Sequence, residues 1–189
     1  MLDSIWPFRK TKRFQFYDWR DVPTDSQDLA RTMELAGFFM SHAVWCVSMG
    51  ESLIPLIGFE DRKGWHLLRM LDKRLEAGVE RGDQWVESNP ERIARAALIF
   101  DGYYTGAAQR TDALAAKVVQ YGQERWYVQI IVPYRHAKSP AGFAVHRPKF
   151  RDDGENEDRK DWLMGAFFRG SDLHHQGAEV WHSCLDESL

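Results

Sequence analysis

The chain has 189 residues, of which 44% are hydrophobic and 28% are charged, an ordinary composition for a globular protein. This length predicts a single domain, and the formal net charge of −3 excludes a global attraction to nucleic acid or to anionic membranes. No stretch reaches the ~18 apolar residues of a membrane span, and the first residues lack the apolar core of a signal peptide. We therefore expect a cytoplasmic protein without membrane association.

The first strong pattern predicts a long helix between Thr24 and Gly50. Pro23 precedes Thr24, and Gln27 follows three residues later, which is the capping-box arrangement that begins a helix. Apolar side chains then recur at helical spacing, at Leu29, Met33, Ala36, Met40, Ala43 and Val47. Further apolar residues surround the second half of this segment. The pattern predicts a central, buried helix.

A short strand over residues 52–59 and a second helix over residues 63–87 are expected next. Pro55 lacks an N–H group, so it favours an edge position or a bulge for the strand. Gly78 and Gly82 lie one turn apart in the helix, where each costs about 1 kcal/mol relative to alanine. We therefore expect these two glycines to permit close packing against another element.

Strands dominate the following part of the chain. Residues 93–105 and 126–133 have the alternating or β-branched composition of strands, and residues 142–146 form a shorter candidate. The alanines of residues 113–121 favour helix, but the length of the segment favours a strand, which is our interpretation. Helices followed by a run of strands predict a single α+β domain over residues 1–189: an antiparallel sheet of four to five strands, packed on one face by two long helices.

Two segments are expected to lie outside the packed elements. Residues 151–161 are almost wholly charged. Such a composition buries too little apolar area to offset the entropy of ordering, so we expect a mobile loop. Residues 1–22 favour an irregular or strand-like lead-in.

The last part of the sequence carries residues of types that ligate metals. A short apolar run over residues 162–168 precedes a polar stretch that we interpret as an exposed tail. The candidate ligands are Asp172, His174, His175, His182 and Cys184. Their spacing matches no zinc pattern, since no second cysteine pair exists. We predict neither a metal site nor a cofactor.

The strongest candidate for a binding site is a basic block, because residues 125–151 contain no acidic residue. Arginine grips carboxylates and phosphates in a bidentate manner, and interleaved aromatic rings add contact area. The candidate binding residues are Tyr134, Arg135, His136, Phe143, His146, Arg147 and Lys149. The simpler interpretation is a solvated surface that the following acidic run balances.

Carboxylates next to turns form a second candidate site. Asp101 precedes Gly102, and Asp112 follows the predicted loop, so either carboxylate is a candidate general base. Aspartate and glycine are also ordinary turn residues, which is the simpler interpretation. His42 and Glu51 also allow two interpretations. Either residue is a candidate titratable group of an active site, or His42 is a packed core histidine and Glu51 a capping or surface carboxylate.

These patterns lead to two hypotheses of different classes. The first is a non-enzymatic protein-binding or inhibitory module, similar in kind to an immunity protein, which presents the basic block to a partner with an acidic surface. Nucleic acid is not the expected partner, and the sequence predicts no oligomeric state. The alternative is a hydrolase or transferase for an anionic substrate, with a site built from Asp101, Asp112, Arg135, His136 and His146. No phosphate loop, dinucleotide-binding or hydrolase motif is present.

Overall fold

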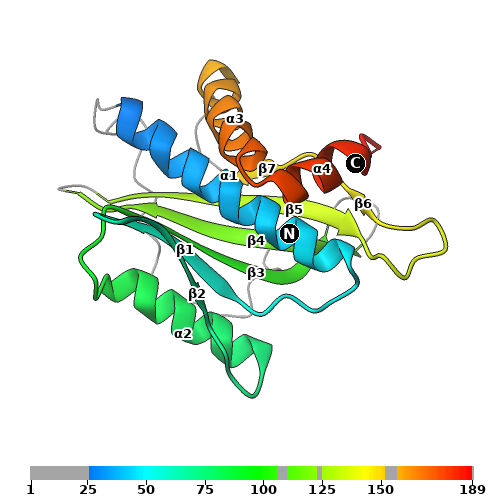
Figure 1. The fold of residues 1–189 in the computed structure, drawn as a ribbon, viewed down its shortest axis with the longest axis horizontal. Helices are drawn as coiled ribbons and strands as arrows, with labels where there is room; N and C mark the ends of the chain where they lie inside the picture. The colour runs from blue at the N-terminus through cyan, green and yellow to red at the C-terminus, as the bar shows by residue number, and fades with distance from the viewer. Residues whose placement is uncertain (1–25, 106–109, 123–124, 152–156, 189) are drawn as a thin grey trace.

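The computed structural model describes residues 26–105, 110–122, 125–151 and 157–188. These residues form helices on both faces of one antiparallel sheet (Figure 1). In chain order the elements are α1 (Ser26–Ser48), β1 (Leu56–Asp61), β2 (Gly64–Arg69), α2 (Leu75–Ser88), β3 (Arg95–Thr105), β4 (Arg110–Gln120), β5 (Trp126–Arg135), β6 (Ala144–Val145), β7 (Lys149–Arg151), α3 (Glu157–Asp172) and α4 (His175–Ser183).

The sheet has seven strands in the order β2-β1-β3-β4-β5-β6, and β7 also pairs with β5. All of these pairings are antiparallel. β3 and β4 are the longest pair, with a register that runs from Arg95 opposite Gln120 to Thr105 opposite Arg110. The fold is therefore α+β, as the sequence predicts, and residues 113–121 are a strand, as we interpreted them.

α1 is the central helix, which confirms the sequence prediction. It crosses one face of the sheet, and α3 and α4 cover its other side (Figure 1). Because α1 is enclosed on two sides, apolar residues on most of its circumference are buried, against the sheet on one side and against α3 and α4 on the other. Those with at most 3% of their surface exposed are Met33, Leu35, Ala36, Phe39, Met40, Ala43, Val44 and Val47.

Glycines allow α1 to approach α3 and α4 closely. A Cβ atom at Gly37 of α1 would overlap the carbonyl oxygen of Phe167 in α3. In the reverse direction, a Cβ atom at Gly170 of α3 would overlap the carbonyl oxygen of Glu34, and one at Gly177 of α4 would overlap that of Ser41. Because no side chain larger than hydrogen fits at these positions, the glycines set the distance between the helices.

α2 covers the opposite face of the sheet, where Val79 and Val86 enter a second, smaller core. A Cβ atom at Gly78 would meet the carbonyl oxygen of Met70 at 2.5 Å, and one at Gly82 would meet Leu98 Cδ1 at 2.6 Å. The predicted close packing of these two glycines is confirmed. The helix is further attached to β4 by Lys117, which bonds carboxylates of α2.

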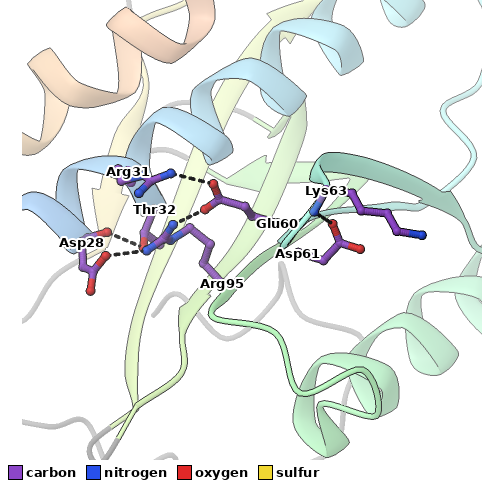
Figure 2. Close-up of polar contacts among 7 residues, drawn as sticks. All are labelled: Asp28, Arg31, Thr32, Glu60, Asp61, Lys63 and Arg95. Carbon is purple, nitrogen blue, oxygen red and sulfur yellow. Dashed lines mark hydrogen bonds and ion pairs between the residues drawn. The ribbon is translucent and has the colours of Figure 1, made fainter.

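A buried arginine joins α1 to the sheet (Figure 2). Arg95 of β3 is 4% exposed, and its guanidinium forms an ion pair with Asp28 at 2.7 Å and another with Glu60 of β1. Its Nε donates to Thr32 Oγ1 at 3.2 Å. Arg31 adds a second cation on Glu60 at 2.9 Å. A charge buried this deeply is tolerated because its N–H groups face carboxylate or hydroxyl oxygens.

Five details of the predicted fold are wrong. The sheet has seven strands rather than four to five, the described residues form four helices rather than two, and helices cover both faces of the sheet. The predicted helix over residues 63–87 is a strand in its first part, because Gly64, with φ of 125°, closes a turn that pairs β2 with β1. The polar stretch after residue 168, predicted as an exposed tail, forms the end of α3 and all of α4, and its Trp181 is buried.

The expected mobile loop over residues 151–161 is only partly covered by the structure. Arg151 belongs to β7, and residues 157–161 form the first turn of α3. Residues 152–156 lie outside the described residues, so their mobility stays a prediction. The lead-in over residues 1–22 also lies outside them.

Replacing Gly37 with alanine tests the close helix approach. The new methyl group would overlap the backbone of α3, so we expect Gly37→Ala to lower the free energy of unfolding by about 1–3 kcal/mol. Gly165→Ala is the matched control: the nearest atom to its Cβ is Arg169 Nη1 at 3.9 Å. Alanine is the better helix former there, so we expect equal or greater stability. Urea denaturation of both variants measures the difference, and equal stability of the two would contradict the packing argument.

Candidate functional site

The strand registers leave an overhang at one end of the sheet. β1 pairs with β3 only as far as Ile99, so the last residues of β3 continue beyond the start of β1. A cavity of about 480 Å³ lies here between the overhang, the segment before β1 and the first turn of α2. A second cavity of about 500 Å³ adjoins it toward β5. Both are lined by Tyr103, Arg110 and Asp112.

A half-buried carboxylate marks the junction of the two cavities. Asp101 lines the first cavity, and Tyr134 lines the second. The Tyr134 hydroxyl lies 3.0 Å from both carboxylate oxygens of Asp101 and donates its single proton to them. Burial raises the pKa of Asp101 above its ordinary value, and the nearby charge of Asp112 acts in the same direction. Burial and the Asp101 charge also raise the pKa of the Tyr134 hydroxyl. The Tyr134 hydroxyl therefore keeps its proton, and Asp101 binds a proton more readily than an ordinary aspartate does.

Four of the five residues of the enzyme hypothesis line one cavity. Asp112, Arg135, His136 and His146 all border the space of about 500 Å³, and Asp101 is bonded to Tyr134 on its wall. The overhang of β3 and β4 and the ends of β5 and β6 bring these residues together. The cavity is also lined by Tyr103 and Arg110, which lie close to the two predicted carboxylates in the sequence but were not among the five residues of the enzyme hypothesis. The Arg110 guanidinium carbon lies 3.6 Å from the centre of the Tyr103 ring.

The basic block forms a surface beside this cavity. We call Arg135, Arg147 and Lys149 the basic face. The Arg135 side chain is 36% exposed and its Nε donates to the carbonyl oxygen of Gly142 at 3.0 Å. The Arg147 side chain is 69% exposed. Lys149 Nζ lies 5.4 Å from the centre of the Tyr104 ring.

The other residues of the binding hypothesis lie behind or beside the basic face. Tyr134 and His146 are each only 3% exposed. Phe143 is half-buried, with its ring centre 6.0 Å from that of Tyr134. His136 Nδ1 accepts the backbone N–H of Lys138 at 3.0 Å. Of the seven residues of the predicted site, Arg147 is therefore exposed, Arg135, His136, Phe143 and Lys149 are half-buried, and Tyr134 and His146 are buried.

An acidic segment of the same chain lies against the basic face. Residues 185–188 follow α4, and Arg135 Nη1 contacts Asp186 Oδ2 at 3.1 Å. The Arg147 guanidinium contacts Glu187 Oε1 through Nε at 3.1 Å and through Nη2 at 2.5 Å. The acid-free stretch of the sequence thus receives its counter-charges in space from residues 40 and 51 positions away.

Backbone pairing fixes the same segment to β6. The N–H of Val145 donates to the carbonyl of Cys184, and the N–H of Asp186 donates to the carbonyl of Val145, both at 2.9 Å. This is a parallel bridge between Val145 and Leu185. His146 Nδ1 lies 2.7 Å from the carbonyl oxygen of Asp186. Since a carbonyl only accepts, His146 carries its proton on Nδ1.

The histidines of the predicted tail are separated rather than gathered around a metal. Within the described ranges, no group of three or more histidine, cysteine, aspartate or glutamate side chains is arranged to hold a metal ion. His182 contacts Asp172 at 2.9 Å on the surface of α4. Cys184 is a half-buried free thiol at the end of that helix. His175 and Glu51 are exposed.

His174 instead pairs with His42 between α1 and α4. The N–H of Gly177 donates to His174 Nδ1 at 3.0 Å, so neutral His174 carries its proton on Nε2 and donates it to His42 Nδ1 at 3.1 Å. His42 Nε2 then faces the Cys46 thiol at 3.7 Å. Burial raises the pKa of that thiol, which argues against a reactive thiolate. The cluster joins two helices.

This histidine pair predicts a pH dependence of stability. Burial, with the nearby His174 and Arg69, lowers the pKa of His42 from 6.5 to about 4, so the unfolded chain binds a proton over a range where the native chain does not. Stability is therefore complete above about pH 6.5 and falls as the pH drops toward 4. We expect a loss on the order of 1–2 kcal/mol after solvent screening of this half-exposed group.

Urea denaturation between pH 7 and pH 4 measures this loss. His42→Gln should flatten the pH dependence, because glutamine does not titrate. His182→Gln, on the exposed surface of α4, is the control and should leave the slope intact. An equal slope in the wild-type chain and the His42 variant would contradict the assignment.

Comparisons with known proteins give no relative for this arrangement. No family model, curated protein or solved structure matches the chain. Among the residues that the structure describes, none of the helices combines the length and the apolar character that crossing a membrane requires.

Proposed function

We propose that the chain is a protein-binding module whose basic face receives an acidic segment of a partner protein. The observation that supports this proposal most directly is the contact with residues 185–188. This surface already accommodates an acidic extended segment, through the arginine–carboxylate pairs of Arg135 and Arg147 and through pairing with β6. An inhibitory role of the immunity-protein kind is one form that such a function takes.

The charge and exposure of the face suit an acidic partner. Lys149 lies over the Tyr104 ring and is the third cation of the basic face. Nε and Nη2 of Arg147 both donate to Oε1 of Glu187, so one guanidinium group holds a carboxylate oxygen through two charge-assisted hydrogen bonds. Such contacts at an exposed surface act mainly on the association rate and weaken with salt.

Reversing the charge of the basic face tests the proposal. The probe is a fluorescent twelve-residue peptide that alternates leucine with aspartate or glutamate. We expect the wild-type chain to bind it and the affinity to fall as salt rises from about 50 to about 200 mM. Changing Arg135, Arg147 and Lys149 to glutamate together should abolish binding, as measured by fluorescence anisotropy.

A matched control reverses the same number of exposed cations elsewhere. Arg62, Lys73 and Arg92 lie on loops away from β5 and β6, and changing them to glutamate gives the same net charge. This control should retain most of the affinity. A basic-face variant that binds as tightly as the control would contradict the proposal.

The second candidate function is an acid–base enzyme, a hydrolase or transferase for an anionic substrate. The convergence of Asp101, Asp112 and Tyr134 at the two cavities favours it. A pair of carboxylates in unequal environments is how enzymes obtain an acid and a base at one pH. Asp101, with its raised pKa, is the candidate general acid, and Asp112 is the candidate base. Arg110 is the candidate anchor for the substrate anion.

Hydrolysis of nitrophenyl phosphate and nitrophenyl sulfate tests this second function. A general acid contributes about 10²- to 10⁴-fold to the rate, so Asp101→Asn should lower kcat by at least about 100-fold. Asp72→Asn, at an exposed position before α2, is the control. Equal turnover by wild type and the Asp101 variant would exclude an acid–base role for this carboxylate toward these substrates.

A further inference from the structure

Residues 185–188 occupy the surface that the proposed partner needs. The N–H of Asp186 bonds the carbonyl of Val145, and the carbonyl of Asp186 accepts the Nδ1–H of His146. The side chains of Asp186 and Glu187 contact the guanidinium groups of Arg135 and Arg147. Hydrogen bonds from Ser188 lower the pKa of Asp186 to about 2, and Arg135 acts in the same direction. Its carboxylate is therefore charged at neutral pH and competes for the same arginine as an incoming acidic residue.

We propose that residues 185–188 are a built-in competitor, and that an acidic partner segment binds the basic face by displacing them. This inference rests on the proposed function, since it specifies how the same site is regulated. The segment follows directly on α4, so its effective concentration at the face is high. A partner must overcome this advantage, so the intact chain binds the partner more weakly than the free face would.

The segment is attached weakly enough to be displaced. Its side chains keep part of their surface in solvent: Leu185 is 40% exposed, and the side chains of Asp186 and Glu187 are 28% and 60% exposed. The strand to which it adds, β6, has only two residues. Exposed ion pairs of this kind contribute little each, so the attachment depends on several small terms.

The contacts of the segment also specify what a partner must offer. A parallel extended strand would donate to the carbonyl of Val145 and accept the Nδ1–H of His146, as Asp186 does. Two consecutive acidic side chains would then face Arg135 and Arg147, as Asp186 and Glu187 do. Backbone pairing supplies affinity and the acidic pair supplies selectivity, which is strand addition at a sheet edge.

Weakening the competitor in the full-length chain tests the inference. Asp186→Asn combined with Glu187→Gln removes both carboxylates and keeps the shape of the segment. With the same acidic dodecapeptide as probe, we expect the dissociation constant to fall by at least about five-fold relative to the wild-type chain. A peptide with asparagine and glutamine in place of its acidic residues should bind neither protein measurably.

A charge-matched control separates local competition from net charge. Glu80→Gln with Glu91→Gln removes two exposed carboxylates far from the basic face and should leave the affinity near the wild-type value. Amide hydrogen exchange gives a second measurement on the wild-type chain. The N–H of Asp186 is bonded to Val145, so its exchange should accelerate when saturating peptide displaces the segment.

The outcomes distinguish this inference from the proposed function. Tighter binding by the variant, with faster exchange at Asp186 in the wild type, supports both. Equal affinity of wild type and variant, with unchanged exchange at Asp186, would overturn the competitor and leave the binding face in place. Absence of binding to both proteins, at low salt and with both folded by circular dichroism, would overturn the proposed function and this inference together.

Discussion

The enclosure of α1 between the sheet and the pair α3 and α4 constrains the rest of the structure. A helix that is covered on two sides buries the polar groups that face its neighbours, so each of these groups requires a partner from a neighbouring element. Thr32 accepts Arg95, Ser41 bonds Ser171 at 2.9 Å, and His42 meets His174. The glycine contacts then determine how near the covering helices come. Packing and polar pairing on α1 therefore fix one orientation of α3 and α4.

That orientation places the end of α4 at the site. Gly177 lies against Ser41 of α1, and its N–H donates to Nδ1 of His174, the N-cap residue of α4. These contacts fix the start of α4 on α1. Trp181 is buried among Phe167 and Phe168, which fixes the second turn of the helix. The chain leaves α4 at Cys184 beside β6, where its carbonyl accepts the N–H of Val145. The acidic segment reaches the basic face because these contacts hold the end of α4 beside β6.

Local sequence patterns predict those helices and strands whose apolar residues recur at the spacing of the element. The stripe of α1, the strand composition of residues 126–133 and the glycines of α2 follow from short-range rules, and the structure confirms all three. β2 was missed because Trp65 and Leu68 fit a helical stripe as well as they fit a strand, and the pairing with β1 that decides between them lies outside the local window. α4 was missed because its polar residues conceal the spacing of Ala178 and Trp181.

The candidate site shows that a stretch of sequence without acidic residues can still have carboxylates next to its arginines in the folded chain. The window of residues 125–151 is free of acids, yet Arg135 and Arg147 meet carboxylates from beyond position 185, a relation that only the packing of α4 creates. The sequence predicts Tyr134 as an aromatic contact of the binding site, but the residue is buried and its hydroxyl donates to Asp101, two strands away. A surface formed in this way has its own complement already attached. The proposed binding of an acidic partner would therefore depend on how readily that complement leaves, as much as on the cations themselves.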